Sequence, residues 1–139
     1  MRTIFQIITL MSTLCFVGLS TSFPSYAVSE PKVTEAEPEK GPNRGRMLRD
    51  GNFAIELSIF ETGVPPEFRV WATDGGKAVD PSKVDLNVKL TRLGDGIDDI
   101  NFYQEGEYLR GDMVIYEPHS FMVSLSAKYQ GKTFNWQYD

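Results

Sequence analysis

Large apolar residues alternate with small or polar residues in five segments of the chain. This period of two is typical of a β-strand that presents one face to a core. The segments cover residues 53–59, 68–72, 84–90, 121–129 and 134–138. Weaker runs at residues 46–49, 100–103 and 113–116 predict two or three further strands.

Turn-forming residues separate these segments at intervals typical of an all-β domain. They occur at residues 63–66, 74–77, 94–96 and 130–131. The Gln130-Gly131 pair predicts a tight hairpin between the last two strands, and Pro81 begins a stretch that predicts one helical turn. We therefore predict an all-β fold, an antiparallel immunoglobulin-like or fibronectin-like β-sandwich of seven to eight strands.

The first 27 residues have the pattern of a cleavable signal peptide. Arg2 supplies a positive start, residues 4–19 are mostly apolar, and Ser25 and Ala27 are small residues at the −3 and −1 positions of a cleavage site. The alternative is a retained membrane anchor, but the apolar run is short and interrupted for a bilayer span. We therefore expect a periplasmic protein without stable membrane insertion after cleavage.

Residues 28–40 are rich in Glu, Lys and Pro and contain no aromatic residue. This composition predicts a flexible acidic linker, because it offers too little apolar surface to offset the entropy lost on ordering. The β-sandwich domain is then expected over residues 41–139. A formal net charge of -5 argues against nucleic acid as a partner. With 1 Cys and 1 His, a multi-cysteine zinc site, an iron–sulfur cluster and a disulfide framework are excluded.

The sequence contains no recognisable catalytic set. A Ser/His/Asp triad would have to use His119, and no nucleophile signature such as GxSxG accompanies that residue. Asp98 and Asp99 are adjacent, so on a strand their side chains point to opposite faces. These observations predict that the protein is not an enzyme.

Two features indicate a surface that contacts a partner. Arg44, Arg46 and Arg49 form a basic cluster in an acidic protein, which suits an acidic partner, although a solvated strand edge is the alternative. Trp71 is out of phase with Phe68, which predicts an outward-facing ring and a contact patch. Packing of that ring beneath a neighbouring loop is the alternative for Trp71.

Several strings resemble the N-terminal β-domain of periplasmic adaptor subunits of heavy-metal efflux pumps. These are the cobalt/zinc/cadmium adaptors of RND pumps, within the HlyD or membrane fusion protein family. The strings are IFETGVPPEFRV, LTRLG, YLRGD and EPHSF, and the resemblance covers residues 41–139. Adaptors of this family continue into further domains, whereas this sequence stops at Asp139. The resemblance therefore implies a stand-alone accessory domain that acts on an RND efflux pump or its adaptor subunit. A metal-independent protein-interaction module in the periplasm is the alternative.

The same resemblance makes His119 a candidate metal ligand, with Glu117 and Met122 beside it in sequence. A thioether would favour Cu(I), and a carboxylate would favour Zn or Co. The alternative is that His119 bonds locally at its turn and that Met113 and Met122 fill gaps in the core. Relatives often carry a His where this chain has Asn43, so a good ligand is missing from that loop. We predict at most a labile transition-metal site and no certain cofactor.

Overall fold

The computed structural model describes residues 36–94 and 96–139, so the predicted signal peptide and residues 28–35 of the predicted linker lie outside the described residues. Within the described residues every strand is antiparallel to its neighbours. The strands are β1 (Arg46–Asp50), β2 (Phe53–Phe60), β3 (Glu67–Asp74), β4 (Lys77–Ala78), β5 (Asp85–Arg92), β6 (Gly96–Glu105), β7 (Tyr108–Val114), β8 (Met122–Tyr129) and β9 (Lys132–Tyr138). One 3₁₀ turn, Pro81–Lys83, precedes β5, which confirms the predicted helical turn.

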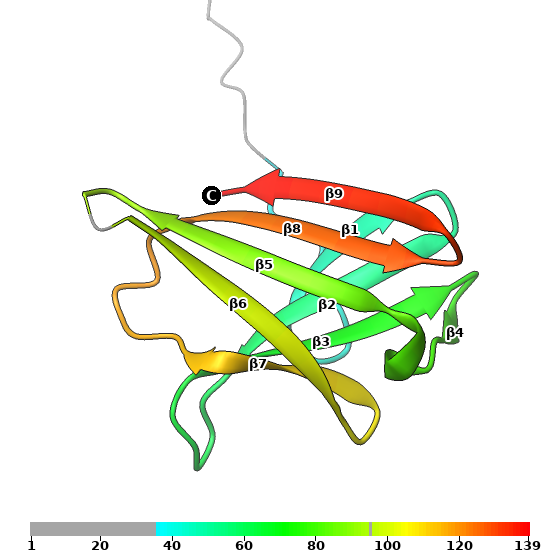
Figure 1. Ribbon diagram of the computed structural model, residues 1–139, viewed down its shortest axis with the longest axis horizontal. Helices are drawn as coiled ribbons and strands as arrows, with labels where there is room; N and C mark the ends of the chain where they lie inside the picture. The colour runs from blue at the N-terminus through cyan, green and yellow to red at the C-terminus, as the bar shows by residue number, and fades with distance from the viewer. Residues whose placement is uncertain (1–35, 95) are drawn as a thin grey trace, which may run out of the picture. The chain divides into compact units, whose positions relative to one another are not determined.

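A single sheet of nine strands runs through the described residues in the order β1-β2-β3-β7-β6-β5-β8-β9, with β4 beside β3. The first half of β6 pairs with β5 and its second half pairs with β7. This long strand therefore carries the sheet from one layer into the other, and β5, β8 and β9 lie in front of β1, β2 and β3 in Figure 1. The all-β antiparallel prediction is confirmed, but one nearly closed, barrel-like sheet of nine strands replaces the predicted sandwich of seven to eight.

The core lies between the two layers. In β5 and β8 every second residue is buried, as the alternation predicts. The fully buried side chains with the largest volumes come from both layers: Phe68, Ile55, Leu90, Ile100, Ile115, Leu125, Val70, Val88 and Val123. Burial of this apolar surface holds the layers together.

β1 and β9 are the two ends of the sheet, and among the described residues no strand pairing joins them. Aromatic side chains close the seam between them. The ring of Phe53 lies 4.5 Å from that of Phe134 and 4.8 Å from that of Tyr129, measured between centroids. Trp136 Nε1 donates a hydrogen bond to the Arg49 carbonyl oxygen at 3.3 Å. The seam is thus held by side chains instead of a backbone ladder.

The strand predicted weakly at residues 113–116 lies earlier in the chain, as β7. The reason is Gly111, which occupies an inward-facing, buried position in the middle of that strand. A Cβ at this glycine would lie 3.1 Å from Ile100 Cγ2 and 3.5 Å from Phe68 Cβ. Neighbouring side chains fill the space that an apolar residue would otherwise occupy, so the alternation is interrupted.

The predicted hairpin at residues 130–131 is confirmed. Tyr129 pairs with Lys132, and the two residues between them, Gln130 and Gly131, have φ angles of 49° and 76°. Two consecutive positive φ angles define the type I′ turn, whose twist matches that of the strands it connects.

We expect Gly111→Val to destabilise the domain by about 1–3 kcal/mol, because the added methyl groups must enter space filled by Ile100 and Phe68. Urea denaturation followed by tryptophan fluorescence measures the change. Thr133→Val on the exposed part of β9 is the control and should leave the midpoint nearly unchanged. An unchanged midpoint for Gly111→Val would show that this position is not tightly packed.

Candidate docking surface

The loop at residues 41–45 is anchored by a buried carboxylate. Glu56 on β2 is 3% exposed. Its Oε1 accepts hydrogen bonds from the backbone N–H groups of Asn43 (2.7 Å) and Gly45 (2.9 Å), and its Oε2 accepts one from Asn43 Nδ2 (3.0 Å). A buried carboxylate needs such donors to offset its loss of hydration. Glu56 therefore holds the loop against the outer face of the sheet.

The turn itself fits closely over β2. A Cβ on Gly45 would lie 2.6 Å from the Leu57 carbonyl oxygen, so only glycine allows this approach. The Gly41 N–H donates to the Gly45 carbonyl oxygen at 2.9 Å. Arg44 has a φ of 63° and is exposed in the turn. The loop therefore presents a cationic residue at a defined place on the surface.

Glu39 and Lys40, which the sequence analysis assigns to the linker, also contact β1. Lys40 forms a β-bridge with Arg46, and the Met47 N–H donates to the Glu39 carbonyl oxygen at 2.8 Å. The Glu39 carboxylate accepts two hydrogen bonds from the Arg49 guanidinium, at 2.7 and 2.8 Å. These hydrogen bonds lower the pKa of Glu39 below its usual value.

A cleft of about 1070 Å³ opens beside this loop, between the end of β2 and the ends of β8 and β9. It exists because β1 begins opposite Leu57, whereas β2 continues to Phe60 along β3. Its apolar lining includes Ile59, Phe68, Phe121, Val123 and Tyr138, and its cationic lining is Lys40, Arg44, Arg46 and Arg69. We call this cleft the basic groove.

Arg46 lies over an aromatic ring at the edge of the basic groove. Its guanidinium carbon is 3.9 Å from the centroid of the Tyr138 ring, and its Nη1 donates to the Asp139 carbonyl oxygen at 3.4 Å. Burial raises the pKa of the Tyr138 phenol to about 12, and the nearby positive charge of Arg46 lowers it by less. The cation and the ring thus form one fixed unit that spans the seam between β1 and β9.

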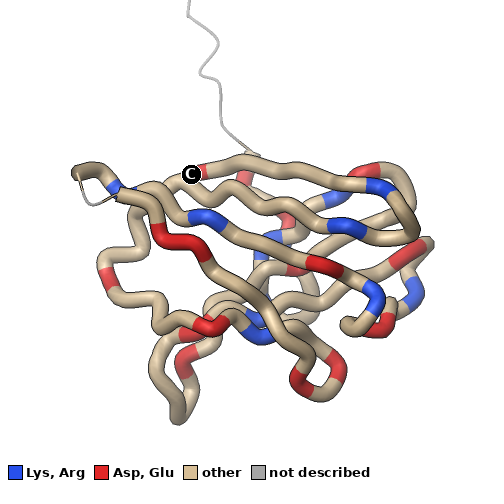
Figure 2. The backbone as a smooth tube through the Cα atoms, viewed as in Figure 1, with Lys and Arg blue, Asp and Glu red and all other residues tan. Residues whose placement is uncertain are grey.

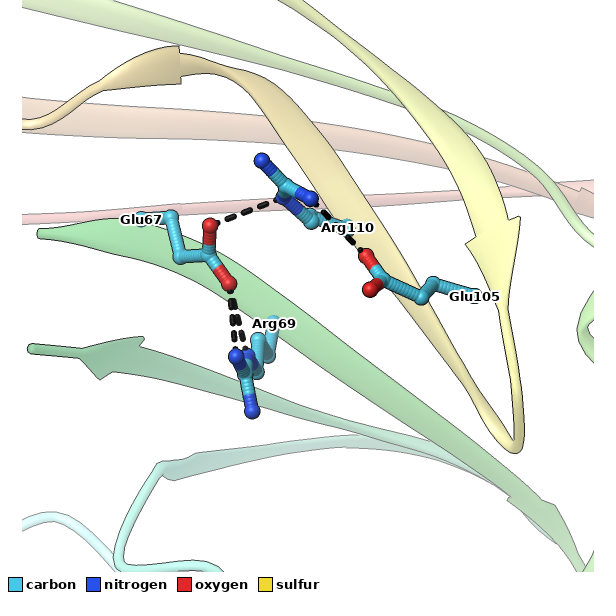
Figure 3. A network of polar contacts seen from close by, with 4 residues as sticks. All are labelled: Glu67, Arg69, Glu105 and Arg110. Carbon is cyan, nitrogen blue, oxygen red and sulfur yellow. Dashed lines mark hydrogen bonds and ion pairs between the residues drawn. The ribbon is translucent and has the colours of Figure 1, made fainter. Parts of the chain in front are cut away.

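A network of ion pairs orders the outer face next to the groove (Figure 3). Arg69 on β3 and Arg110 on β7 are directly paired in the sheet, where like charges repel. Glu67 lies between them, 7% exposed, with Oε1 accepting from Arg69 Nε and Oε2 2.8 Å from Arg110 Nε. Glu105 accepts a further hydrogen bond from Arg110 Nη1 at 3.1 Å. The carboxylate of Glu67 thus offsets the repulsion between the two arginines and links β3 to β7.

Aromatic rings continue this network along the surface. The Arg69 guanidinium lies 3.6 Å from the centroid of the Phe60 ring and 4.7 Å from that of Tyr108. The Tyr108 ring lies 5.5 Å from that of Trp71. Trp71 is half-buried on the outer face, whereas Phe68 is buried in the core. The outward phase predicted for Trp71 is therefore correct, and Tyr108 is the neighbour on which it packs.

Three of the residues predicted to bind a partner meet at one place. Arg44, Arg46 and Trp71 all line the basic groove, whereas Arg49 is not among its lining residues and pairs with Glu39. Sequence reasoning missed Arg69, which lies two residues before Trp71 on the same face of β3. Tyr108 of β7 contacts both side chains. The alternation along this strand could have identified Arg69, because it faces outward in phase with Trp71.

The predicted metal ligands are only partly brought together. His119 lines the basic groove, but its Nε2 lies 3.2 Å from the Ile115 carbonyl oxygen. Glu117 is exposed, and the Met122 sulfur on β8 accepts a hydrogen bond from Gln137. Within residues 36–94 and 96–139, no group of three or more His, Cys, Asp or Glu side chains could hold a metal ion. Met113 packs against the core, in line with the alternative interpretation.

Charges of both signs are interspersed along the strands (Figure 2). The basic groove is therefore a local feature of a chain whose formal net charge is -5. In the part of the chain that the structure describes, no helix has the length and apolar character needed to cross a membrane.

Comparison with known proteins places the chain in a family. Residues 45–136 match the family described as CzcB, N-terminal domain. No curated protein matches the chain significantly. A crystal structure of a DUF4426 family protein from Pseudomonas aeruginosa PAO1 is similar in fold, with a TM-score of 0.52 and 14% sequence identity. The similarity covers 67% of this chain and 94% of that protein, and at this identity it concerns the fold alone.

We expect Glu56→Ala to destabilise the protein by about 1–3 kcal/mol, because the N–H groups of Asn43 and Gly45 lose their buried acceptor. Urea denaturation gives the free energy of unfolding, and amide hydrogen exchange should accelerate at these two residues. The exposed carboxylate of Glu61 offers a matched control, Glu61→Ala, with little effect. Unchanged exchange in Glu56→Ala would mean that other contacts hold the loop.

The raised pKa of Tyr138 predicts a loss of stability at high pH. A phenol with a raised pKa in the folded state contributes stability below its unfolded pKa of about 10. That contribution is lost as the pH rises from about 10 through the folded pKa of about 12. Titration followed by tyrosinate absorbance should show a late phase that Tyr138→Phe reduces, while Tyr129, whose pKa is also raised by burial and by its hydrogen bond to Asp74, contributes the remainder. Titration of every tyrosine near its ordinary pKa would contradict the burial of this phenol.

Proposed function

The chain belongs to the CzcB N-terminal domain family, and from this we propose that it is a non-enzymatic periplasmic accessory domain of a heavy-metal efflux system. In this proposal the domain docks onto the RND pump or its adaptor subunit. The observation that carries the proposal is the family match, which extends over residues 45–136 and so includes most strands of the folded unit.

The basic groove is the contact surface in this proposal. Its lining brings Arg44, Arg46 and Trp71 together, and two of its cations are held by neighbouring groups instead of moving freely. Side chains that are already ordered lose little conformational entropy when a partner binds. Because the rest of the chain is acidic, a cationic groove also orients the approach of an acidic partner.

Transient binding of Zn, Co or Cu at His119 is the alternative mode of action. It would rest on one imidazole whose Nε2 already faces the Ile115 carbonyl oxygen. A second imidazole or a thiolate would strengthen such a site, and the described residues supply neither. The contacts of His119 therefore support docking better than metal binding. A metal-independent interaction with a partner outside the efflux system is the other alternative.

Docking is tested by surface plasmon resonance of the purified protein on the heavy-metal RND pump and on the full-length adaptor of the same bacterium. We expect saturable binding to one of them, weakened at least about tenfold in an Arg44→Ala, Arg46→Ala double variant and weakened by added salt. Arg49→Ala is the matched control, since Arg49 pairs with Glu39 away from the groove. Absence of binding to both proteins would refute docking to the efflux system.

Metal binding is decided by a separate measurement. Calorimetric titration of the protein with Zn, Co and Cu(I), in parallel with His119→Ala, should show no saturable binding that depends on His119. Stoichiometric binding that the variant abolishes would replace docking with metal binding as the preferred function.

A further inference from the structure

The end of β2 offers a place for one more strand. On one side, β2 pairs with β3 as far as Phe60, but on the other side β1 begins opposite Leu57. The ladder on the β1 side therefore stops before Ser58, Ile59 and Phe60. A strand edge of this kind is a template on which an extended segment of another protein can pair.

The loop at residues 41–45 lies next to this edge without extending the ladder along it. Its contact with the segment is a side-chain bond, in which Ser58 Oγ donates to the Asn43 carbonyl oxygen at 3.1 Å. Glu56 fixes the loop in place through the hydrogen bonds described above. The loop therefore forms one wall of the basic groove, and the edge of β2 forms another.

Below this edge, the groove has an apolar floor. Phe68 and Phe121 contact each other edge to face, with ring centroids 6.4 Å apart, and both line the groove together with Ile59 and Val123. In an added strand, alternate side chains would point toward this floor and the others toward solvent and the rim. The floor thus selects a segment with apolar residues at every second position.

The charged residues at the rim of the groove determine which charge suits the solvent-facing side chains of the added strand. Lys40, Arg44 and Arg46 line the groove with Arg69, whose charge is paired with that of Glu67, and the acidic lining residues are Glu61 and Asp139. Arg46 and Arg69 are held over aromatic rings, and Arg44 is exposed in the turn. Charge complementarity therefore favours carboxylates on the solvent-facing side of the bound segment.

We propose that the basic groove binds an extended acidic segment of a partner protein, in which apolar and acidic residues alternate, by adding it as a strand to the edge of β2 at Ser58, Ile59 and Phe60. This proposal deepens the docking function by naming the chemistry of the partner. A second copy of this chain is a poorer occupant, because both copies would bring the same cationic rim.

The test uses a short, end-capped synthetic peptide of alternating glutamate and valine, labelled for fluorescence anisotropy. We expect saturable binding to the wild-type protein, weakened at least about tenfold by charge reversal with Arg44→Glu, a change at an exposed residue that leaves the core intact. Lys132→Glu, at an exposed residue that does not line the groove, is the matched control for net charge. In nuclear magnetic resonance spectra, the amides of Ser58, Ile59 and Phe60 should shift on binding.

Three matched peptides separate the parts of the proposal. A lysine–valine peptide removes the charge complementarity, a glutamate–serine peptide removes the apolar contacts, and an N-methylated glutamate–valine peptide removes donors for strand pairing. Each should bind at least about tenfold more weakly than the glutamate–valine peptide. Equal binding of the N-methylated peptide, equal binding of the lysine–valine peptide, or failure of the glutamate–valine peptide to bind would each overturn the proposal.

The outcome can be distinguished from that of the docking experiment. If the pump or adaptor binds but the peptide does not, the strand-addition proposal fails while docking to the efflux system stands. If the peptide binds but neither protein does, the groove recognises acidic segments of another partner and the proposed function fails. Sedimentation analysis adds a further check, since a dimer blocked by Arg44→Glu would assign the groove to a second copy and overturn the proposal.

Discussion

The carboxylate of Glu56 is the interaction on which the candidate surface depends. It is buried on the outer face of β2 and binds the loop at residues 41–45 through Asn43 and Gly45. These hydrogen bonds, together with that from Ser58 Oγ to the Asn43 carbonyl oxygen, fix the loop beside the end of β2 and so place Arg44 at the groove. A buried acidic group that neutral donors satisfy in full is thus the element that places a cation on the surface.

The curvature of the sheet brings β8 and β9 to the side of the groove opposite the loop and β2. Because β6 pairs with strands of both layers, β8 and β9 are brought across from β1 and β2. The seam is then closed by side chains, with Phe53 among the aromatic residues of β8 and β9 and Arg46 over Tyr138. The groove lies where β1 has not yet begun beside β2, next to the end of this seam at Tyr138.

Parts of the candidate surface could be predicted from the sequence, since the outward phase of Trp71 and the clustering of Arg44 and Arg46 are local properties. The contacts of Arg69 with Phe60 and Tyr108 could not, because they depend on the pairing of β3 with β2 on one side and with β7 on the other. Glu117, His119 and Met122 are close in sequence, but this closeness does not determine whether their side chains meet in space. In space, the His119 nitrogen faces a carbonyl oxygen, and Met122 lies on a strand beside Gln137.

The sequence by itself determined the all-β class, most strand positions and the hairpin at residues 130–131, because alternation and turn preferences act between residues close in the chain. Tertiary structure alone decided that one sheet would curl into a nearly closed barrel, and that Gly111 would occupy a core position. These outcomes depend on which distant strands pair and on whether a neighbour such as Ile100 fills the available space. Contacts between residues far apart in the chain leave no periodic trace in the sequence.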